Sequence, residues 1–203
     1  MRLEKLIAEA DAKRAYEEVM TNIERDCQPF LKQSDRVYYR GSNSANVAKM
    51  IQFVRPRSNR RPKDMPQHVH DALDKSFKKY FGWKVRSEGV FAGDRTGVIG
   101  QYGSLFLFFP IGKFKYVYSP YIKDLYMHIN DKISGDLRFH ADPDNDKLEK
   151  HDTDLLDELV RTEYEDKGLS GHIDGVEVSF YCPNGYYMVD YAMVNMIKKR
   201  FNL

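Results

Sequence analysis

Three short segments of the chain carry the side chains best suited to chemistry. Arg40 follows an apolar stretch in VYYRGS, Phe91 and Tyr102 lie in GVFAGDRTGVIGQYG, and Glu177 begins an apolar run in VEVSFYCPNGYYMVD. A strand-end arginine can fork onto phosphate, and an aromatic corner can hold a flat ring. A carboxylate at a strand head can accept a hydrogen bond from a sugar hydroxyl and stabilise an oxocarbenium-like centre. Taken alone, each segment also fits an ordinary solvated strand end or turn.

Other groups of polar residues fit a metal site poorly. In DPDNDKLEKHDT the calcium-loop pattern requires glycine where Lys147 stands and glutamate where Thr153 stands. His68 and His70, beside Asp71, lack further ligands at metal spacing, so we expect them on the surface of a helix. The sequence contains no P-loop, G-x-S-x-G or catalytic-cysteine signature. We therefore expect no bound metal.

A basic segment, RPRSNRRPKD at 55–64, contains two prolines and predicts a loop. Arg57, Arg60 and Arg61 could contact the phosphates of a dinucleotide or of a nucleic acid. Aromatic residues are not interleaved with these arginines, so base stacking is not indicated. A solvated loop without a binding role remains an open alternative.

The composition is that of a folded protein from a reducing compartment. The 203 residues include 14 Tyr, 12 Phe and 1 Trp, and the formal net charge is +2, which by itself implies no partner. The two cysteines, Cys27 and Cys182, do not form a disulfide framework. The charged N-terminus lacks the apolar core of a signal peptide, and the longest apolar run is too short to span a membrane. We expect a soluble, cytoplasmic protein.

The spacing of apolar residues predicts the helices. Three-to-four spacing indicates helices at 3–25 and 65–81, the second with Asp64 as cap, Pro66 in its first turn and Gly82 at its end. Further helical segments are expected at 98–103, at 121–129, in the region of Leu155 to Val160, and in a C-terminal tail started by Asp190.

Short apolar runs predict the strands, which cluster later in the chain than the helices. We expect strands at 37–39, 83–91, 104–109, 114–118, 137–140, 176–182 and 186–189, with a further apolar run at 50–54. The runs at 104–109 and 114–118 are predicted to form a hairpin, and the last two strands are predicted to pair with each other. This arrangement favours a single α+β domain with a mixed or antiparallel sheet.

In their order along the chain, the three segments resemble the ADP-ribosyltransferase superfamily. That family has an arginine after its first core strand, then an aromatic corner with a helical segment, then a glutamate that heads a late strand. The segment VEVSFYCPNGYYMV is similar to the toxin-type pattern, and GVFAGD is similar to the polymerase-type corner. The stretch from RSEGVF to KDLY resembles phage-related members. The resemblance covers roughly residues 36–190.

The resemblance implies a fold and an activity. The fold would be a split mixed or antiparallel sheet flanked by helices, with an N-terminal helical segment at 1–35 and a catalytic core at 36–203. The activity would be mono-ADP-ribosyl transfer, with NAD as substrate and no metal, in the cytoplasm of a bacterium or a phage-infected cell. The enzyme would cleave the nicotinamide–ribose bond and transfer ADP-ribose to a macromolecular acceptor.

The same resemblance assigns roles to individual residues. Glu177 would accept a hydrogen bond from the ribose 2'-hydroxyl and stabilise the oxocarbenium ion. Arg40 would clamp the pyrophosphate or the adjacent ribose, and Phe91 and Tyr102 would flank the nicotinamide. The expected NAD-binding residues are Arg40, Gly41, Phe91, Tyr102 and Arg57.

The sequence departs from the family pattern at two places: the segment after Phe91 and the position two residues before Glu177. Where the family commonly has Ser-Thr-Ser, this chain has Ala92–Thr96, in which only Thr96 carries a hydroxyl of that kind. Gly175 stands two residues before Glu177, where members that modify arginine have another glutamate. We therefore expect the acceptor to be a nucleic acid, a protein side chain other than arginine, or water.

Two alternatives from other classes remain open. The basic loop is also compatible with an inactive, transferase-like protein that binds nucleic acid. A virion-associated interaction protein without NAD-dependent behaviour is the second alternative.

Overall fold

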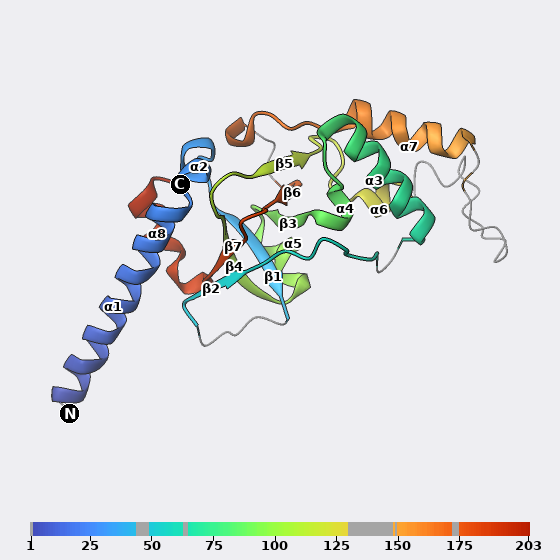
Figure 1. The fold of residues 1–203 in the computed structure, drawn as a ribbon. Helices are drawn as coiled ribbons and strands as arrows, with labels where there is room; N and C mark the ends of the chain where they lie inside the picture. Colours follow the sequence, from blue (N-terminus) through green and yellow to red (C-terminus); the bar gives the residue numbers. More distant parts are fainter. Residues whose placement is uncertain (1, 44–48, 63–64, 130–147, 149, 172–174) are drawn as a thin grey trace. The chain divides into compact units, whose positions relative to one another are not determined.

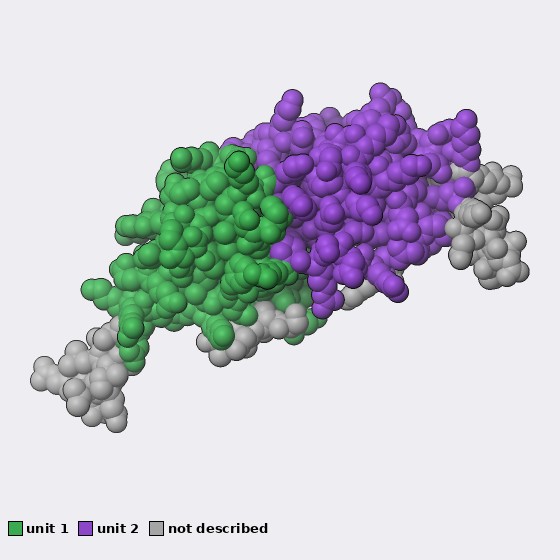
Figure 2. Space-filling model, viewed as in Figure 1, with its two compact units in different colours: residues 1–55, 92–114, 182–203 green, residues 56–91, 115–181 purple. Residues whose placement is uncertain are grey.

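The computed structural model describes residues 2–43, 49–62, 65–129, 148, 150–171 and 175–203, with the side chains of the first ten residues left aside. The chain divides into two compact units, each assembled from segments distant in sequence (Figures 1 and 2). Unit 1 contains residues 1–55, 92–114 and 182–203, and unit 2 contains residues 56–91 and 115–181. The division falls inside one strand, β3 (Val90–Gly93).

Unit 1 is built on antiparallel strands in the order β2-β7-β4-β1-β3. The bounds are β1 Tyr38–Ser42, β2 Ile51–Val54, β4 Ser104–Pro110 and β7 Tyr186–Asp190. Arg40 of β1 is opposite Phe106 of β4, which is opposite Asp190 of β7. Tyr39 of β1 is opposite Gly93 at the end of β3. The strand order places β4, whose residues 106–110 are all buried, between two neighbours.

The helical elements of unit 1 come from both ends of the chain and from the segment after β3. They are α1 Arg2–Asp26, α2 Gln28–Gln33, α5 Thr96–Ile99, the 3-10 turns η1 Gly100–Tyr102 and η4 Tyr191–Met193, and α8 Val194–Phe201. Phe30 of α2 is fully buried, and its ring meets Tyr38 and Phe109 edge to face at 6.0 and 5.8 Å. Asp190 starts the tail as predicted, because its carboxylate accepts from the Ala192 N–H at 2.8 Å. The predicted helices at 3–25 and in the tail are confirmed.

Unit 2 places two long helices beside a short strand pair. Its elements are α3 Gln67–Phe81, α4 Val85–Glu88, β5 Lys115–Tyr118, α6 Leu125–His128, α7 Lys150–Glu163, the 3-10 turn η3 Leu169–Gly171 and β6 Glu177–Tyr181. The strands follow the order β3-β6-β5, and β5 and β6 are antiparallel with Val117 opposite Ser179.

The helices α3 and α7 lie side by side (Figure 1). They share an apolar core. Leu73 and Phe77 of α3 and Leu156 and Val160 of α7 are fully buried in the same cluster. The apolar residues whose spacing predicted this helix are therefore buried on one side of it, and the helix ends at Gly82 as expected. The helix begins at Gln67 with Pro66 as its N-cap residue, so the predicted place of Pro66 in the first turn is wrong. Asp64 and the predicted strand at 137–140 lie outside the described residues. The helix predicted in the region of Leu155 begins earlier, at Lys150.

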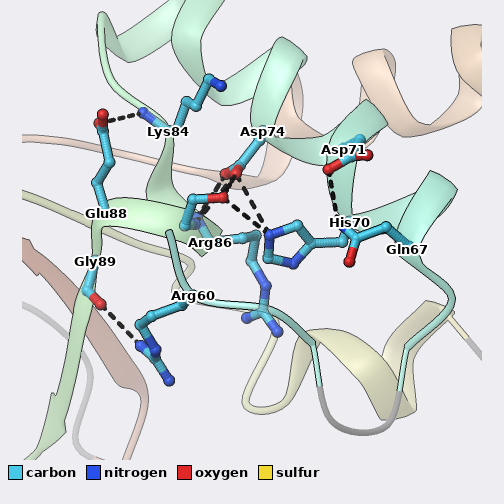
Figure 3. A network of polar contacts seen from close by, with 10 residues as sticks. Arg60, Gln67, His70, Asp71, Asp74, Lys84, Arg86, Glu88 and Gly89 are labelled. Carbon is cyan, nitrogen blue, oxygen red and sulfur yellow. Dashed lines mark hydrogen bonds and ion pairs between the residues drawn. The ribbon is translucent and has the colours of Figure 1, made fainter. Parts of the chain in front are cut away.

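The strand predicted at 83–91 is wrong over Val85–Glu88, which form the short helix α4, and only Val90 and Phe91 lie in a strand, β3. Asp74, on α3, is buried, and its carboxylate accepts from the backbone N–H groups of Arg86 (2.7 Å) and Ser87 (3.1 Å) (Figure 3). The Ser87 hydroxyl donates to the same carboxylate. The first N–H groups of a helix have no partner within it, so an acceptor from elsewhere stabilises the helical turn. Asp74 supplies that acceptor from another helix.

Both predicted strand pairings are also wrong. The runs at 104–109 and 114–118 do form strands, but β4 pairs with β1 and β7 while β5 pairs with β6. Likewise β7 pairs with β2 and β4 and not with β6. A continuously buried strand such as β4 needs a partner on each side, and these partners come from distant parts of the chain. The α+β class and the antiparallel pairing are confirmed.

His70 is buried at 2% exposure, so its expected place on a helix surface is wrong. Its Nε2 lies 3.0 Å from the Ser87 hydroxyl oxygen and 3.5 Å from the Asp74 carboxylate (Figure 3). Its Nδ1 has no hydrogen-bond partner within the described part of the chain. Burial lowers the pKa of His70, an effect that Arg86 reinforces and Asp74 opposes.

Across the described residues, no helix combines the length and the apolar composition that crossing a bilayer requires.

We predict that Asp74→Ala lowers the free energy of unfolding by about 2–4 kcal/mol, because it leaves buried N–H and O–H donors without an acceptor. Urea unfolding followed by circular dichroism measures this change. The matched control is Asp71→Ala on the same helix, where the exposed carboxylate accepts from the Gln67 side chain at 2.8 Å. The control should change stability by less than about 0.5 kcal/mol. Equal losses in the two variants would contradict the capping role.

We predict that acid weakens the fold partly through His70. Because the pKa of His70 is lower in the folded chain than its ordinary value of 6.5, the unfolded chain binds the proton more readily, and stability falls as the pH drops below about 6.5. One such group contributes a slope of at most about 1.4 kcal/mol per pH unit. Urea unfolding between pH 7.5 and 5 should show a smaller slope in His70→Gln than in wild type, with the exposed His151→Gln as control. An unchanged slope in His70→Gln would refute this source.

Candidate functional site

Two of the expected site residues, Glu177 and Phe91, line one pocket within unit 2. The pocket is partly open to solvent, and its inner volume of about 20 Å³ leaves room for about one water molecule. Its walls are Phe77, Val85, Arg86, Phe91, Ile122, Lys123, Leu125, Tyr164, Glu177 and Ser179. A ring the size of nicotinamide would therefore bind at its mouth or require side chains to move.

Glu177 reaches the pocket because it is the first residue of β6. Side chains alternate between the two faces of a strand, so Ser179 shares the face of Glu177 while Val178 is buried on the other. The carboxylate is half-buried, which leaves it accessible from the pocket.

Gly175, two residues before Glu177, has a φ of 85°. This left-handed conformation favours glycine over residues with a side chain. The backbone at Gly175 therefore disfavours any residue that carries a side chain, a glutamate included.

The Phe91 ring contacts two guanidinium groups. The central carbon of Arg60 lies 4.6 Å from the ring centroid and that of Arg86 lies 5.0 Å from it. Both distances fall within the range of cation–π attraction, which is worth about 0.5–2 kcal/mol per contact. Arg60 is also fixed by its Nη1, which donates to the Gly89 carbonyl at 2.8 Å (Figure 3).

The polar residues that line the pocket are mostly residues with hydrogen-bond donors. They are Arg86, Lys123, Ser179 and Tyr164, together with Glu177, the one acidic residue of the lining. Desolvation raises the pKa of Tyr164, and the Glu177 carboxylate adds to this effect while Arg86 opposes it. The phenol therefore keeps its proton at neutral pH and is available as a donor.

The remaining residues of the expected site lie in unit 1, apart from Arg57. Arg40 is half-buried in β1, and its guanidinium lies over the ring of Tyr186, 5.7 Å from the centroid. Gly41 packs directly beneath η1, since a Cβ added there would lie 2.4 Å from the Ile99 carbonyl oxygen and 2.8 Å from the Tyr102 Cβ. Tyr102 is 55% exposed. The structure thus brings Gly41 and Tyr102 together in unit 1.

Arg57 belongs to neither group. It is exposed in the segment that follows β2, and it does not line the pocket of unit 2. Its role in binding phosphate stays a prediction. Thr96, the hydroxyl of the unusual corner sequence, is the first residue of α5.

Several residues of the pocket were missed from the sequence. Ser179 could have been found, because the period of two along a strand places it on the face of Glu177. Arg86 could not, because the segment that contains it was interpreted as a strand. Lys123 and Tyr164 come from separate parts of the chain and give no local signal.

Comparison with known proteins gives no match, whether with family models, curated proteins or solved structures. The resemblance to the ADP-ribosyltransferase superfamily therefore rests on the motifs and their order.

We predict that Gly41→Ala destabilises the chain by about 1–3 kcal/mol, because the added methyl group overlaps the backbone of η1 and its neighbour. The matched control is Gly97→Ala in α5, where an added Cβ meets nothing within 4 Å. Since alanine favours the helical conformation, the control should be neutral or slightly stabilising. Thermal and urea unfolding measure both variants, and a neutral Gly41→Ala would contradict the close packing.

Proposed function

We propose that the protein is an NAD-dependent mono-ADP-ribosyltransferase that modifies a nucleic acid or a protein side chain other than arginine. The observation that carries the proposal is Glu177, a half-buried carboxylate at the head of β6, in one pocket with Phe91 and several donors. A carboxylate can stabilise the positive charge that develops at the ribose when nicotinamide leaves, and an aromatic ring can hold the nicotinamide.

The order of the strands supports the proposal. Arg40 is in β1, the aromatic corner begins at Phe91 in β3, and Glu177 begins β6. In unit 1, β3 follows β1 in the strand order, and in unit 2, β6 follows β3. Within each unit, two strands that carry motifs are thus neighbours, although they are separated along the sequence.

The proposed reaction breaks the bond between nicotinamide N1 and ribose C1'. The electron pair of that bond stays with nicotinamide, which departs neutral, and positive charge develops at C1' and the ring oxygen. Glu177 stabilises this charge and accepts a hydrogen bond from the 2'-hydroxyl. A nucleophilic oxygen or nitrogen of the acceptor then bonds to C1' and releases its proton to solvent.

Phe91 keeps its expected role against nicotinamide in this proposal. Its ring attracts the guanidinium groups of Arg60 and Arg86, and nicotinamide in NAD is also a cation. The cationic nicotinamide ring would replace one guanidinium in the cation–π contact with Phe91. This attraction would end when the bond to ribose breaks, because nicotinamide then loses its positive charge.

We predict that Glu177→Gln reduces release of nicotinamide from NAD by roughly 100-fold or more, because the amide cannot stabilise positive charge at C1'. The assay uses labelled NAD with cell lysate, followed by nuclease or protease digestion to identify the class of acceptor. The control is Glu158→Gln, an exposed residue of α7 that pairs with Arg161. Wild-type rates in Glu177→Gln would refute the site, and salt-sensitive nucleic-acid binding without NAD turnover would favour the binding protein instead.

A further inference from the structure

Arg86 is a charged pocket residue that the proposed reaction does not use. It is in the first turn of α4, and its guanidinium lies over the Phe91 ring while lining the pocket that contains Glu177. Its Nε is buried and has no hydrogen-bond partner in the part of the chain that the structure describes. A buried donor without an acceptor costs about 1–3 kcal/mol, more when it is charged.

The surroundings hold Arg86 in place. Its backbone N–H donates to the Asp74 carboxylate at 2.7 Å, which fixes the backbone of Arg86 in α4. The Phe91 ring supports the guanidinium plane, and Arg60 contacts the same ring. A guanidinium has five N–H donors and no acceptor, so each of its donors needs an acceptor from another group. An acceptor supplied by a ligand would meet this need.

The neighbouring groups indicate which acceptor fits. Lys123, Ser179 and the protonated Tyr164 hydroxyl add donors to the same pocket, against the one carboxylate of Glu177. This excess of donors and positive charge favours an anion. Planar guanidinium groups bind phosphate oxygens in pairs, which makes phosphate the anion that Arg86 suits best.

We propose that Arg86 binds the pyrophosphate of the dinucleotide substrate, at the phosphate nearest the ribose that Glu177 engages. This inference rests on the proposed function for the identity of the ligand. In NAD this ribose separates the nicotinamide bond from the nearer phosphate by a few covalent bonds, so one pocket can present a carboxylate to the ribose and a guanidinium to that phosphate. Arg86 is thus a substrate-binding residue rather than part of the bond-breaking step.

The test uses inorganic pyrophosphate and ADP-ribose as probes on the full chain, with thermal unfolding as the measurement. Millimolar concentrations of either probe should raise the Tm of the wild type but not that of Arg86→Gln. The matched control, Arg161→Gln, removes an exposed cation of α7 in the same unit that does not line the pocket, and should keep the protection. In steady-state assays Arg86→Gln should raise the KM for NAD by roughly 10- to 100-fold with little change in kcat.

Circular dichroism establishes whether Arg86→Gln is folded. If it is not, Arg86→Lys retains the charge without the planar fork and should show weaker protection and a raised KM. Equal protection of wild type and Arg86 variants would overturn the inference, as would protection by a single-stranded oligonucleotide and not by pyrophosphate.

The two proposals can fail separately. Arg86-dependent protection by pyrophosphate in a chain that does not cleave NAD would support the phosphate site and refute the transferase. NAD cleavage with an unchanged KM in Arg86→Gln would do the reverse.

Discussion

The carboxylate of Asp74 is the contact on which the arrangement of unit 2 depends. It belongs to α3, whose apolar stripe packs against α7, and it accepts hydrogen bonds from the first turn of α4. Through α4 it fixes the backbone of Arg86, and α4 leads within two residues into β3 and Phe91. A single buried acceptor therefore links the helical core to the side chains that line the pocket. Because the carboxylate is surrounded by donors, its burial does not leave an uncompensated charge.

The extent to which the sequence predicted the fold depends on where each element finds its partners. The stripe on α3 was predictable, since the contacts of Leu73 and Phe77 follow the helical period. The helix α4 was not, because its cap lies ten or more residues upstream on another helix and VRSEGVF alone resembles a strand. The pairing of β4 was missed for a related reason: short loops suggest hairpins, but continuous burial demands neighbours on both sides.

The candidate site shows the same division. Glu177 and Phe91 were predicted from motifs, and the structure places both at one pocket although 86 positions of sequence separate them. Most of the polar residues around them were not predicted from the sequence, because residues from separate parts of the chain come together only in the folded structure. His70 and Arg86 illustrate this: one looked like a surface histidine, the other like a strand residue, and both are parts of the network around Asp74. A motif locates chemistry along the chain, whereas packing determines which groups accompany it.

The left-handed backbone at Gly175 has a consequence for the evolution of specificity. A glutamate at this position would have to adopt a φ of 85°, at a cost of roughly 1–2 kcal/mol, or reshape the chain before β6. Within the proposed transferase, a change of acceptor to arginine would thus not be reachable by a single codon change at no cost to stability. The backbone of this turn would first have to change its conformation. The backbone that precedes Glu177 would thus limit which acceptors the proposed enzyme could evolve to modify.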